Sequence, residues 1–278
     1  MYYTVKILET TSIQRSYEAA VTAMTSQQFF PIDEEIAQQA AKNIFDGRSC
    51  YLVSGAQAAG KDVVGAALAE RQDKMVQVRM SDQIRVETET LLDIVRGSDT
   101  QTQAAEAAKV ELVLEDVHAL HMVSSVWERA RKDPEFSAWT RDDTMRGLLQ
   151  YFGSDGRNNL QPGYWTQACY FALANNVANN IGVYMADGRY PTEVNMGTTV
   201  GVHATRLFVP EDIRIERIRR RDGFTPNLET LRHSGEIALD EHWTTFDMVI
   251  DNSEEVDDVI NVVEAIEANA EHMLDRLQ

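Results

Sequence analysis

The chain has 278 residues, of which 44% are hydrophobic and 25% are charged, a composition typical of a globular protein and not of a collagenous or disordered one. Its 26 basic and 44 acidic residues give a formal net charge of -18, which disfavours general binding to nucleic-acid backbones. Two cysteines, Cys50 and Cys169, cannot form a disulfide framework, and no stretch approaches the roughly 20 apolar residues that span a bilayer. We therefore expect a cytoplasmic protein with no membrane partner.

Five short apolar runs with β-branched residues predict buried strands. They span residues 49–54, 75–80, 181–186, 198–209 and 246–250. The segments between these runs have helical periodicity, and the alternation of strands with helices indicates an α/β fold. We expect a three-layer α/β/α domain over residues 48–278, with a mostly parallel five-stranded sheet covered by helices on both faces.

Two long helical intervals flank the first strands of this sheet. Residues 1–47 contain expected helices at 16–25 and 33–45, and we interpret them as an accessory segment that covers a sheet edge or contacts another subunit. Residues 81–180 are too many for one crossover connection, and their pattern is helical throughout, over 101–131, 142–151 and 164–178. This second interval is expected to be a helical insertion that shapes a substrate pocket.

The last helix has a clear start signal. Asn252 and Glu255 resemble a capping box, in which each residue bonds the backbone N–H of the other. Apolar residues with the spacing of one helical face follow them. These residues are Val256, Val259, Ile260, Val263 and Ile266.

The sharpest signal is a strand that runs into a glycine-containing turn and then into a helix. Gly55 and Gly60 bracket four residues, and Lys61 and a helical segment over 63–71 follow. Glycines let backbone N–H groups face a polyphosphate, the helix N-terminus adds partial positive charge, and Lys61 can reach the β and γ phosphates. The pattern predicts a P-loop that binds ATP, in preference to an ordinary turn with a surface lysine. The expected nucleotide ligands are Gly55, Ala56, Gln57, Ala58, Ala59, Gly60, Lys61, Asp62 and Val63.

Two aspartates are candidate magnesium ligands. Asp62 stands where the usual loop has serine or threonine, and a carboxylate there can hold Mg²⁺ directly or through water. Asp187 follows the apolar run 181–186, so it should lie at the carboxyl edge of the sheet, where open α/β folds bind ligands. We expect Asp187 to orient magnesium or the substrate.

From the loop onward, the sequence resembles the deoxynucleoside monophosphate kinases of bacteriophages, within the P-loop nucleoside monophosphate kinase group. Several of them also have Gly-Lys-Asp in the loop, and further elements recur in the same order over about residues 49–266. These elements are Arg146-Gly-Leu-Leu-Gln150, Gly153-Ser-Asp155 with Arg157 and Trp165, Asp187-Gly-Arg189-Tyr-Pro-Thr-Glu193, and Asp251-Asn252. The resemblance implies transfer of the γ-phosphoryl group of ATP, with Mg²⁺, to a deoxynucleoside 5′-monophosphate. It also implies a phage enzyme of the host cytoplasm and a homodimer.

The same elements supply candidate ligands of the acceptor nucleotide. Arg146 and Gln150 are four residues apart on an expected helix and face the same way, where arginine suits a phosphate and glutamine a base edge. In the following loop, Asp155 is expected to meet a sugar hydroxyl or to anchor an arginine, and Arg157 belongs to the same element. Trp165 either stacks on a base or packs in a core, which is the commoner role of tryptophan.

Three more residues complete the expected acceptor site. Arg85 opens the helix after the second strand and is a secondary candidate for the monophosphate, with a solvated helix face as its alternative. Arg189 follows Asp187 and suits a bidentate contact with a phosphate. Glu193 either joins this site or forms an ion pair with Arg189 that fixes the loop.

The densest basic run in this acidic chain lies at 214–221, after the fourth strand. Enzymes of this fold carry a mobile lid with arginines at this point, which stabilise the charge on the transferred phosphoryl group and exclude water. We interpret residues 211–240 as such a lid. Arg217 and Arg221, four apart on one helical face, are its leading phosphate ligands, and with Lys61 and Asp187 they form the expected catalytic set.

Two other functions remain open. One is a kinase that acts on a hydroxymethylated base, in a nucleotide or in DNA, although the acidic charge disfavours a duplex substrate. The other is a regulatory protein that binds a nucleotide without transferring its phosphate. No histidine or cysteine pattern of a protein-built metal site or of a nucleophile elbow is present in the sequence.

Overall fold

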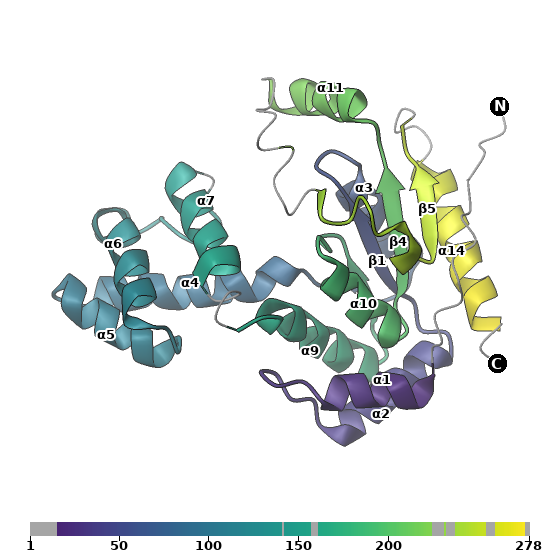
Figure 1. Cartoon of the computed structure of the whole chain (residues 1–278), viewed down its shortest axis with the longest axis horizontal. Helices are drawn as coiled ribbons and strands as arrows, with labels where there is room; N and C mark the ends of the chain where they lie inside the picture. The colour runs from purple at the N-terminus through teal and green to yellow at the C-terminus, as the bar shows by residue number, and fades with distance from the viewer. Residues whose placement is uncertain are drawn as a thin grey trace. The chain divides into compact units, whose positions relative to one another are not determined.

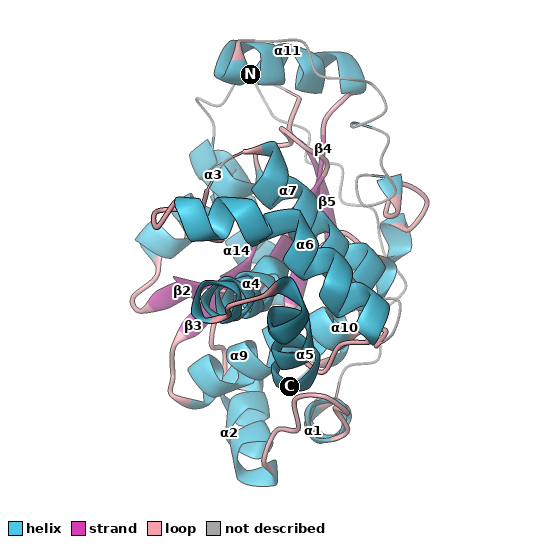
Figure 2. Ribbon diagram, turned by 90° about the vertical axis from the view of Figure 1, so that its left-hand side faces the viewer, coloured by secondary structure: helices cyan, strands magenta, loops and turns pink. Residues whose placement is uncertain are grey.

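The structure, a computed structural model, describes residues 16–140, 142–156, 161–223, 231, 237–253 and 259–275. The side chains of residues 146, 154–156 and 274–275 lie outside this description. Its strands are β1 (Cys50–Gly55), β2 (Met75–Gln77), β3 (Gly182–Met185), β4 (His203–Phe208) and β5 (Met248–Asp251). They form one sheet in the order β2-β3-β1-β4-β5, with every neighbouring pair parallel. Figure 1 labels β1, β4 and β5, and Figure 2 labels β2 and β3. The expected α/β fold and its five strands are confirmed, and the sheet is wholly parallel.

Helices cover both faces of the sheet, because side chains of a strand alternate between the two faces. Tyr51 and Val53 of β1 pack in one core with α3 (Lys61–Arg71) and α14 (Val259–Asp275). Leu52 points to the other face, where it meets the backbone of Gly188 and of α10 (Pro191–Thr199). The strands, magenta in Figure 2, therefore lie between two helical layers.

The second layer is extended by helices from the N-terminal segment. These are α1 (Tyr17–Thr25), which Ser16 caps by accepting a hydrogen bond from the Ala19 N–H, and α2 (Glu34–Phe45). The Nδ2 of Asn43 donates to the Val177 carbonyl at 2.7 Å, which ties α2 to the end of α9 (Tyr164–Ala178). The accessory segment thus packs on a helical layer of the sheet domain.

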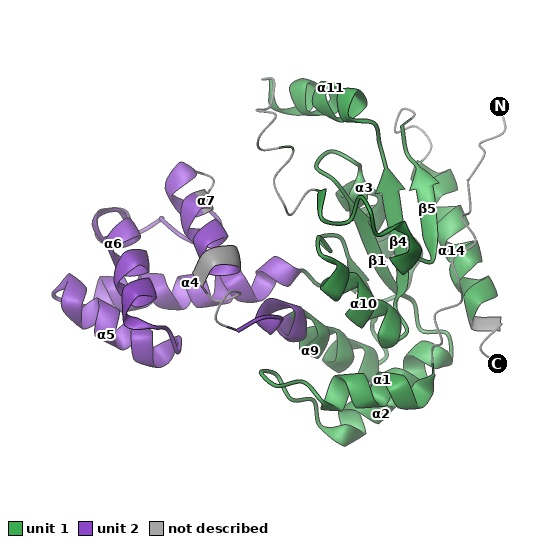
Figure 3. Ribbon diagram, viewed as in Figure 1, with its two compact units in different colours: residues 1–79, 169–278 green, residues 80–168 purple. Residues whose placement is uncertain are grey.

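Residues 80–168 form a second compact unit with a core of its own (Figure 3). Its elements are α4 (Met80–Gly97), α5 (Gln101–Glu111), α6 (Asp116–Lys132), α7 (Asp143–Gln150) and the π-helix η1 (Tyr151–Gly156). The sequence places the end of this insertion at residue 180, whereas the unit ends at Ala168, within α9. The reason is that the second half of α9 belongs to the sheet domain, where Tyr170, Leu173 and Val177 are buried.

Two sequence expectations about element boundaries are wrong. The expected helix 101–131 is two helices, α5 and α6, separated by a turn in which Val113 has a φ of 52°. The expected strand 198–209 begins only at His203, because residues 198 and 199 complete α10 and Gly201, with a φ of 95°, follows that helix in the left-handed conformation of a C-terminal cap.

Smaller differences concern the second strand and the last helix. The strand expected over 75–80 covers only Met75–Gln77, since Met80 already belongs to α4. Val263 and Ile266 of α14 are buried as expected, but Ile260 is 58% exposed. Glu255 and Val256, part of the expected capping box and apolar face, lie outside the described residues.

The remaining elements are α11 (Glu211–Asp222) and the short 3₁₀ helix η2 (Trp243–Thr245). In the described part of the chain, no helix combines the length and apolar character needed to cross a membrane.

Candidate functional site

The loop between β1 and α3 has the backbone geometry of an anion site. Ala58 and Gly60 both lie in the left-handed region, with φ values of 64° and 92°. Left-handed residues among right-handed ones turn successive N–H groups toward one concave side, which favours an anion. Gly60 is the N-cap of α3, and Lys61 is the first residue of that helix, so the partial positive charge of the helix N-terminus lies at the loop.

The carbonyl groups of this loop are held from outside by two side chains. The Nδ2 of Asn252 donates to the Ala59 carbonyl at 2.8 Å, and Nη1 of Arg217 donates to the Ala58 carbonyl at 3.4 Å. Arg217 also donates from Nη2 to the Asn252 carbonyl at 2.8 Å, which links the two residues to each other. These contacts use loop carbonyls and not the N–H groups, so they hold the loop without occupying its anion-binding donors.

Glycine is required at position 60 for two independent reasons. Its φ of 92° is unfavourable for any residue with a Cβ atom. A Cβ atom at this position would also lie 2.8 Å from the Nδ2 of Asn252, the group that binds Ala59. The sequence predicts the glycine, but Asn252 enters the prediction only as the start of the last helix and as part of the resemblance.

One face of α11 is directed at the loop. Arg214, Arg217, Ile218 and Arg221 are spaced three and four residues apart, so they share this face, and Arg217 reaches the Ala58 carbonyl. Arg214 is only 8% exposed, and its buried Nε and Nη1 atoms have no hydrogen-bond partner among the described residues. A buried guanidinium group without acceptors is unfavourable unless an anion completes it.

Arg221, the second expected lid ligand, has a local partner. Its Nε and Nη2 donate to the two carboxylate oxygens of Asp222, both at 2.7 Å, and its side chain is well exposed. This hydrogen bond, and to a smaller extent the charges of Asp222 and Asp62, raise the pKa of Arg221. Arg221 is therefore close enough to the start of α3 to respond to the carboxylate of Asp62, which is exposed there.

Asp187 follows β3, which pairs directly with β1, so both candidate carboxylates lie near the carboxyl edge of the sheet. The connection after β3 is fixed to β1 by the Ser54 hydroxyl, which donates to the Gly188 carbonyl at 2.8 Å. Arg189 is exposed on this connection. Among the described residues, no cluster of three or more histidine, cysteine, aspartate or glutamate side chains could hold a metal ion.

Glu193 of α10 fixes the connection between β3 and α10. Its Oε2 accepts hydrogen bonds from the backbone N–H of Arg189 at 2.6 Å and of Tyr190 at 3.0 Å, and its side chain is buried. Burial raises the pKa of Glu193 to about 7, with a further increase from Asp187, although the two backbone hydrogen bonds oppose the shift. The geometry favours the loop-fixing interpretation, with contacts to the backbone N–H groups of Arg189 and Tyr190.

Arg206 is a buried residue of the site that the sequence interpretation missed. Its Nη2 donates to Asp240 Oδ1 at 2.6 Å, and its Nη1 contacts the Ser54 hydroxyl at 3.4 Å. Its guanidinium carbon lies 5.5 Å from the ring centroid of Trp243. Arg206 thus joins the end of the expected lid, at Asp240, to Ser54 of the strand that carries the loop. In the sequence, the sign of this residue's role is an arginine within an otherwise apolar strand pattern.

The candidates in residues 80–168 belong to the second compact unit and are described separately. Arg85 donates to the Ala138 carbonyl, and its guanidinium carbon lies 4.5 Å from the ring centroid of Trp139. Trp165 is buried in the core of this unit, 5.7 Å from Phe152 between ring centroids, which favours its packing role. These contacts give Arg85 and Trp165 local structural roles.

The structure describes only some of the other expected ligands of the acceptor nucleotide. Gln150 is exposed at the C-terminal end of α7. Arg146 belongs to the same helix and Asp155 to η1, but their side chains, like the whole of Arg157, lie outside the description. A buried carboxylate that the sequence did not single out, Glu87 of α4, accepts a hydrogen bond from the Tyr164 hydroxyl at 2.6 Å.

The structure therefore brings together the loop, Arg217, Asn252 and the start of α3, and Asp187 follows the neighbouring strand β3. No family model matches the chain, and no curated protein is similar to it in sequence.

Proposed function

We propose that this protein transfers the γ-phosphoryl group of ATP to a deoxynucleoside 5′-monophosphate. The observation that carries the proposal is the loop at 55–60, with left-handed backbone at Ala58 and Gly60 and its carbonyls bonded to Arg217 and Asn252. The loop carbonyls accept hydrogen bonds from protein side chains, and α3 begins directly after the loop. This arrangement suits the triphosphate of a nucleotide. We infer that it is a P-loop.

Cationic side chains beside the loop support phosphoryl transfer over simple nucleotide binding. Lys61 begins α3, and Arg214 and Arg217 share the face of α11 that is directed at the loop. Transfer requires fixed positive groups where negative charge spreads over the phosphoryl oxygens, and no protein nucleophile is needed because the acceptor phosphate attacks. Arg214, whose buried Nε and Nη1 have no partner among the described residues, is a better candidate for this role than Arg221, which is paired with Asp222.

The residues present also fit magnesium. Carboxylate oxygens are the protein ligands this ion prefers, and in phosphate sites one or two of them suffice with the substrate phosphates and water. Asp62, exposed in the first turn of α3, and Asp187, after β3, would hold it. When bound, the ion neutralises charge on the β and γ phosphates.

The acceptor is assigned from the resemblance of the sequence to phage deoxynucleoside monophosphate kinases. The helical unit at 80–168 has its own core, so its surface can vary without disturbing the sheet domain. Base choice depends on a few hydrogen-bonding groups of such a unit. On the same resemblance we propose a cytoplasmic, phage-encoded homodimer.

An ADP-release assay with ATP, Mg²⁺ and a panel of natural and base-modified deoxynucleoside monophosphates tests the proposal. The wild-type protein should form ADP only when an accepted monophosphate is present. Lys61→Ala should lower kcat/KM by about 10²- to 10³-fold, as loss of one transition-state donor does. Lys132→Ala removes an exposed lysine that pairs with Glu128 on α6, and it should leave the rate unchanged.

Two outcomes contradict the proposal. If the wild-type protein is inactive on the whole panel, the assigned acceptor is wrong, and activity on hydroxymethylated DNA or ATP binding without turnover would then identify one of the two alternatives. If Lys61→Ala retains full activity, the loop is not the site of transfer.

A further inference from the structure

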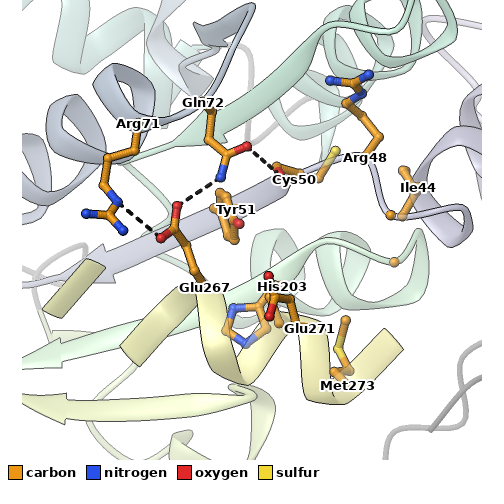
Figure 4. Close-up of a pocket in the computed structure, with 14 residues that line it drawn as sticks. Ile44, Arg48, Cys50, Tyr51, Arg71, Gln72, His203, Glu267, Glu271 and Met273 are labelled. Atoms are coloured by element: carbon orange, nitrogen blue, oxygen red, sulfur yellow. Dashed lines mark hydrogen bonds and ion pairs between the residues drawn. The ribbon is translucent and has the colours of Figure 1, made fainter. Parts of the chain in front are cut away.

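A cavity of about 550 Å³ lies at the edge of the sheet opposite the phosphate loop. It opens at the amino ends of β1 and β4, around Cys50, Tyr51 and His203, whereas the loop follows the carboxyl end of β1 (Figure 4). We call it the amino-edge cavity. Its volume falls in the range of about 300–1,000 Å³ found for small-molecule sites, and it lies wholly within the sheet domain.

Two buried rings line the cavity on the sheet side. Tyr51 and His203 have ring centroids 6.2 Å apart in an edge-to-face arrangement. The Nε2 of His203 lies 2.8 Å from Asn269 Oδ1, and this contact holds the ring in one orientation. The Cys50 thiol is inert here, because burial raises its pKa to about 12.

The cations of the cavity wall are already matched by protein groups. Arg71 donates from Nε to Glu267 Oε2 at 3.2 Å, and the other oxygen of Glu267 accepts from Gln72 at 2.9 Å. Arg48 donates to the side-chain oxygen of Asn180. Glu267 thus has two protein partners, and each arginine has an acceptor within the protein.

Glu271 differs from these groups. It lies one turn beyond Glu267 on α14 and points toward the same cavity, and no hydrogen bond or ion pair joins it to any other residue in the described part of the chain. Burial raises the pKa of Tyr51, and the charges of Glu267 and Glu271 raise it further. An aromatic ring beside an unpaired carboxylate suits a cation.

We propose that the amino-edge cavity binds a small organic cation, an ammonium or guanidinium compound with a flat apolar body. The charged group would pair with Glu271, and the apolar body would lie against the rings of Tyr51 and His203. This site is separate from the phosphate loop and does not depend on phosphoryl transfer.

Isothermal titration with 2-phenylethylammonium tests the site, with phenylacetate as an anion of similar shape. The wild-type protein should bind the ammonium compound and not phenylacetate. Glu271→Gln should weaken binding about fivefold, the upper value for a partly exposed ion pair. Glu35→Gln is the control, because it removes the same charge from an exposed position of α2 that does not line the cavity, and it should bind as the wild type does.

Three results would overturn the proposal. The first is no binding of 2-phenylethylammonium to the wild-type protein at millimolar concentration. The second is equal weakening in Glu271→Gln and Glu35→Gln, which would indicate attraction to the net charge alone. The third is equally tight binding of phenylacetate. Because Glu271 is exposed, its substitution should leave the fold intact, which circular dichroism checks.

Discussion

At the scale of single residues, Glu193 combines burial, two backbone hydrogen bonds and a pKa raised to about 7. The folded state therefore holds the proton of this carboxyl group more tightly than the unfolded state, whose pKa is 4.5. The resulting stabilisation is complete below about pH 4.5 and is lost as the pH rises through about 7.

Glu193→Gln removes this titration but keeps an oxygen that can accept from the N–H groups of Arg189 and Tyr190. The free energy of unfolding of the wild type, relative to the variant, should fall between pH 4.5 and 7 by up to about 1.4 kcal/mol per pH unit and then stay level. Urea denaturation of both proteins at pH 5, 6, 7 and 8 measures it. A difference that does not change with pH would contradict the assigned burial.

At the scale of elements, the turn between α5 and α6 is strained. Val113 has a φ of 52° and is 70% exposed, while its neighbours Leu112 and Leu114 are buried in the core of the helical unit. A β-branched residue is unfavourable in the left-handed region by about 1–2 kcal/mol. The two leucines hold the turn in place in spite of this strain.

Val113→Gly should therefore stabilise the protein, by about 0.5–1 kcal/mol once the larger entropy of glycine in the unfolded chain is subtracted. Val117→Gly is the matched control: Val117 is similarly exposed but lies in the first turn of α6, where glycine lowers helix stability. Thermal unfolding should give Tm shifts of opposite sign. A lower Tm for Val113→Gly would show that the turn is not strained.

This turn also shows why part of the fold is not predictable from the sequence. Apolar residues keep helical spacing through 101–131, and no glycine or proline marks the break, so a single helix is the natural prediction. In contrast, the sequence predicts β3 and α9 to within a residue, because the two apolar stretches are separated by the polar turn at Asn179 and Asn180. Periodicity finds elements, but a turn that tertiary packing imposes leaves no local signal.

The candidate site follows the same division. The loop at 55–60 is readable because its glycines and lysine are consecutive. The contacts of Asn252 with Ala59 and of Arg206 with Asp240 join residues far apart in sequence, and only the parallel order of the strands brings them together. The amino-edge cavity, formed by residues of several elements, was not predictable for the same reason.

At the scale of the whole sheet domain, the strand order explains where function can reside. β1 is central, between β3 and β4, so its carboxyl end is flanked by the connection with Asp187 and by the chain that leads from β4 to α11. The amino end of the same strand opens into the amino-edge cavity. One parallel sheet thus presents two separate edges, and each carries its own proposed ligand.

The central claim is that the loop at 55–60 binds the triphosphate of ATP, and a pair of glycine substitutions tests it most directly. Gly60 and Gly47 have similar φ values, 92° and 101°, so replacing either by alanine introduces the same backbone strain. Only at Gly60 does the new Cβ meet a neighbour, the Nδ2 of Asn252, whereas Gly47 has nothing within 4 Å.

Isothermal titration with a non-hydrolysable ATP analogue and Mg²⁺ compares the two variants with the wild type. We predict that Gly47→Ala binds the analogue as the wild type does, and that Gly60→Ala binds it at least about tenfold more weakly, a difference of about 1.4 kcal/mol. Equal affinity in all three proteins would contradict the assignment of this loop as the phosphate site.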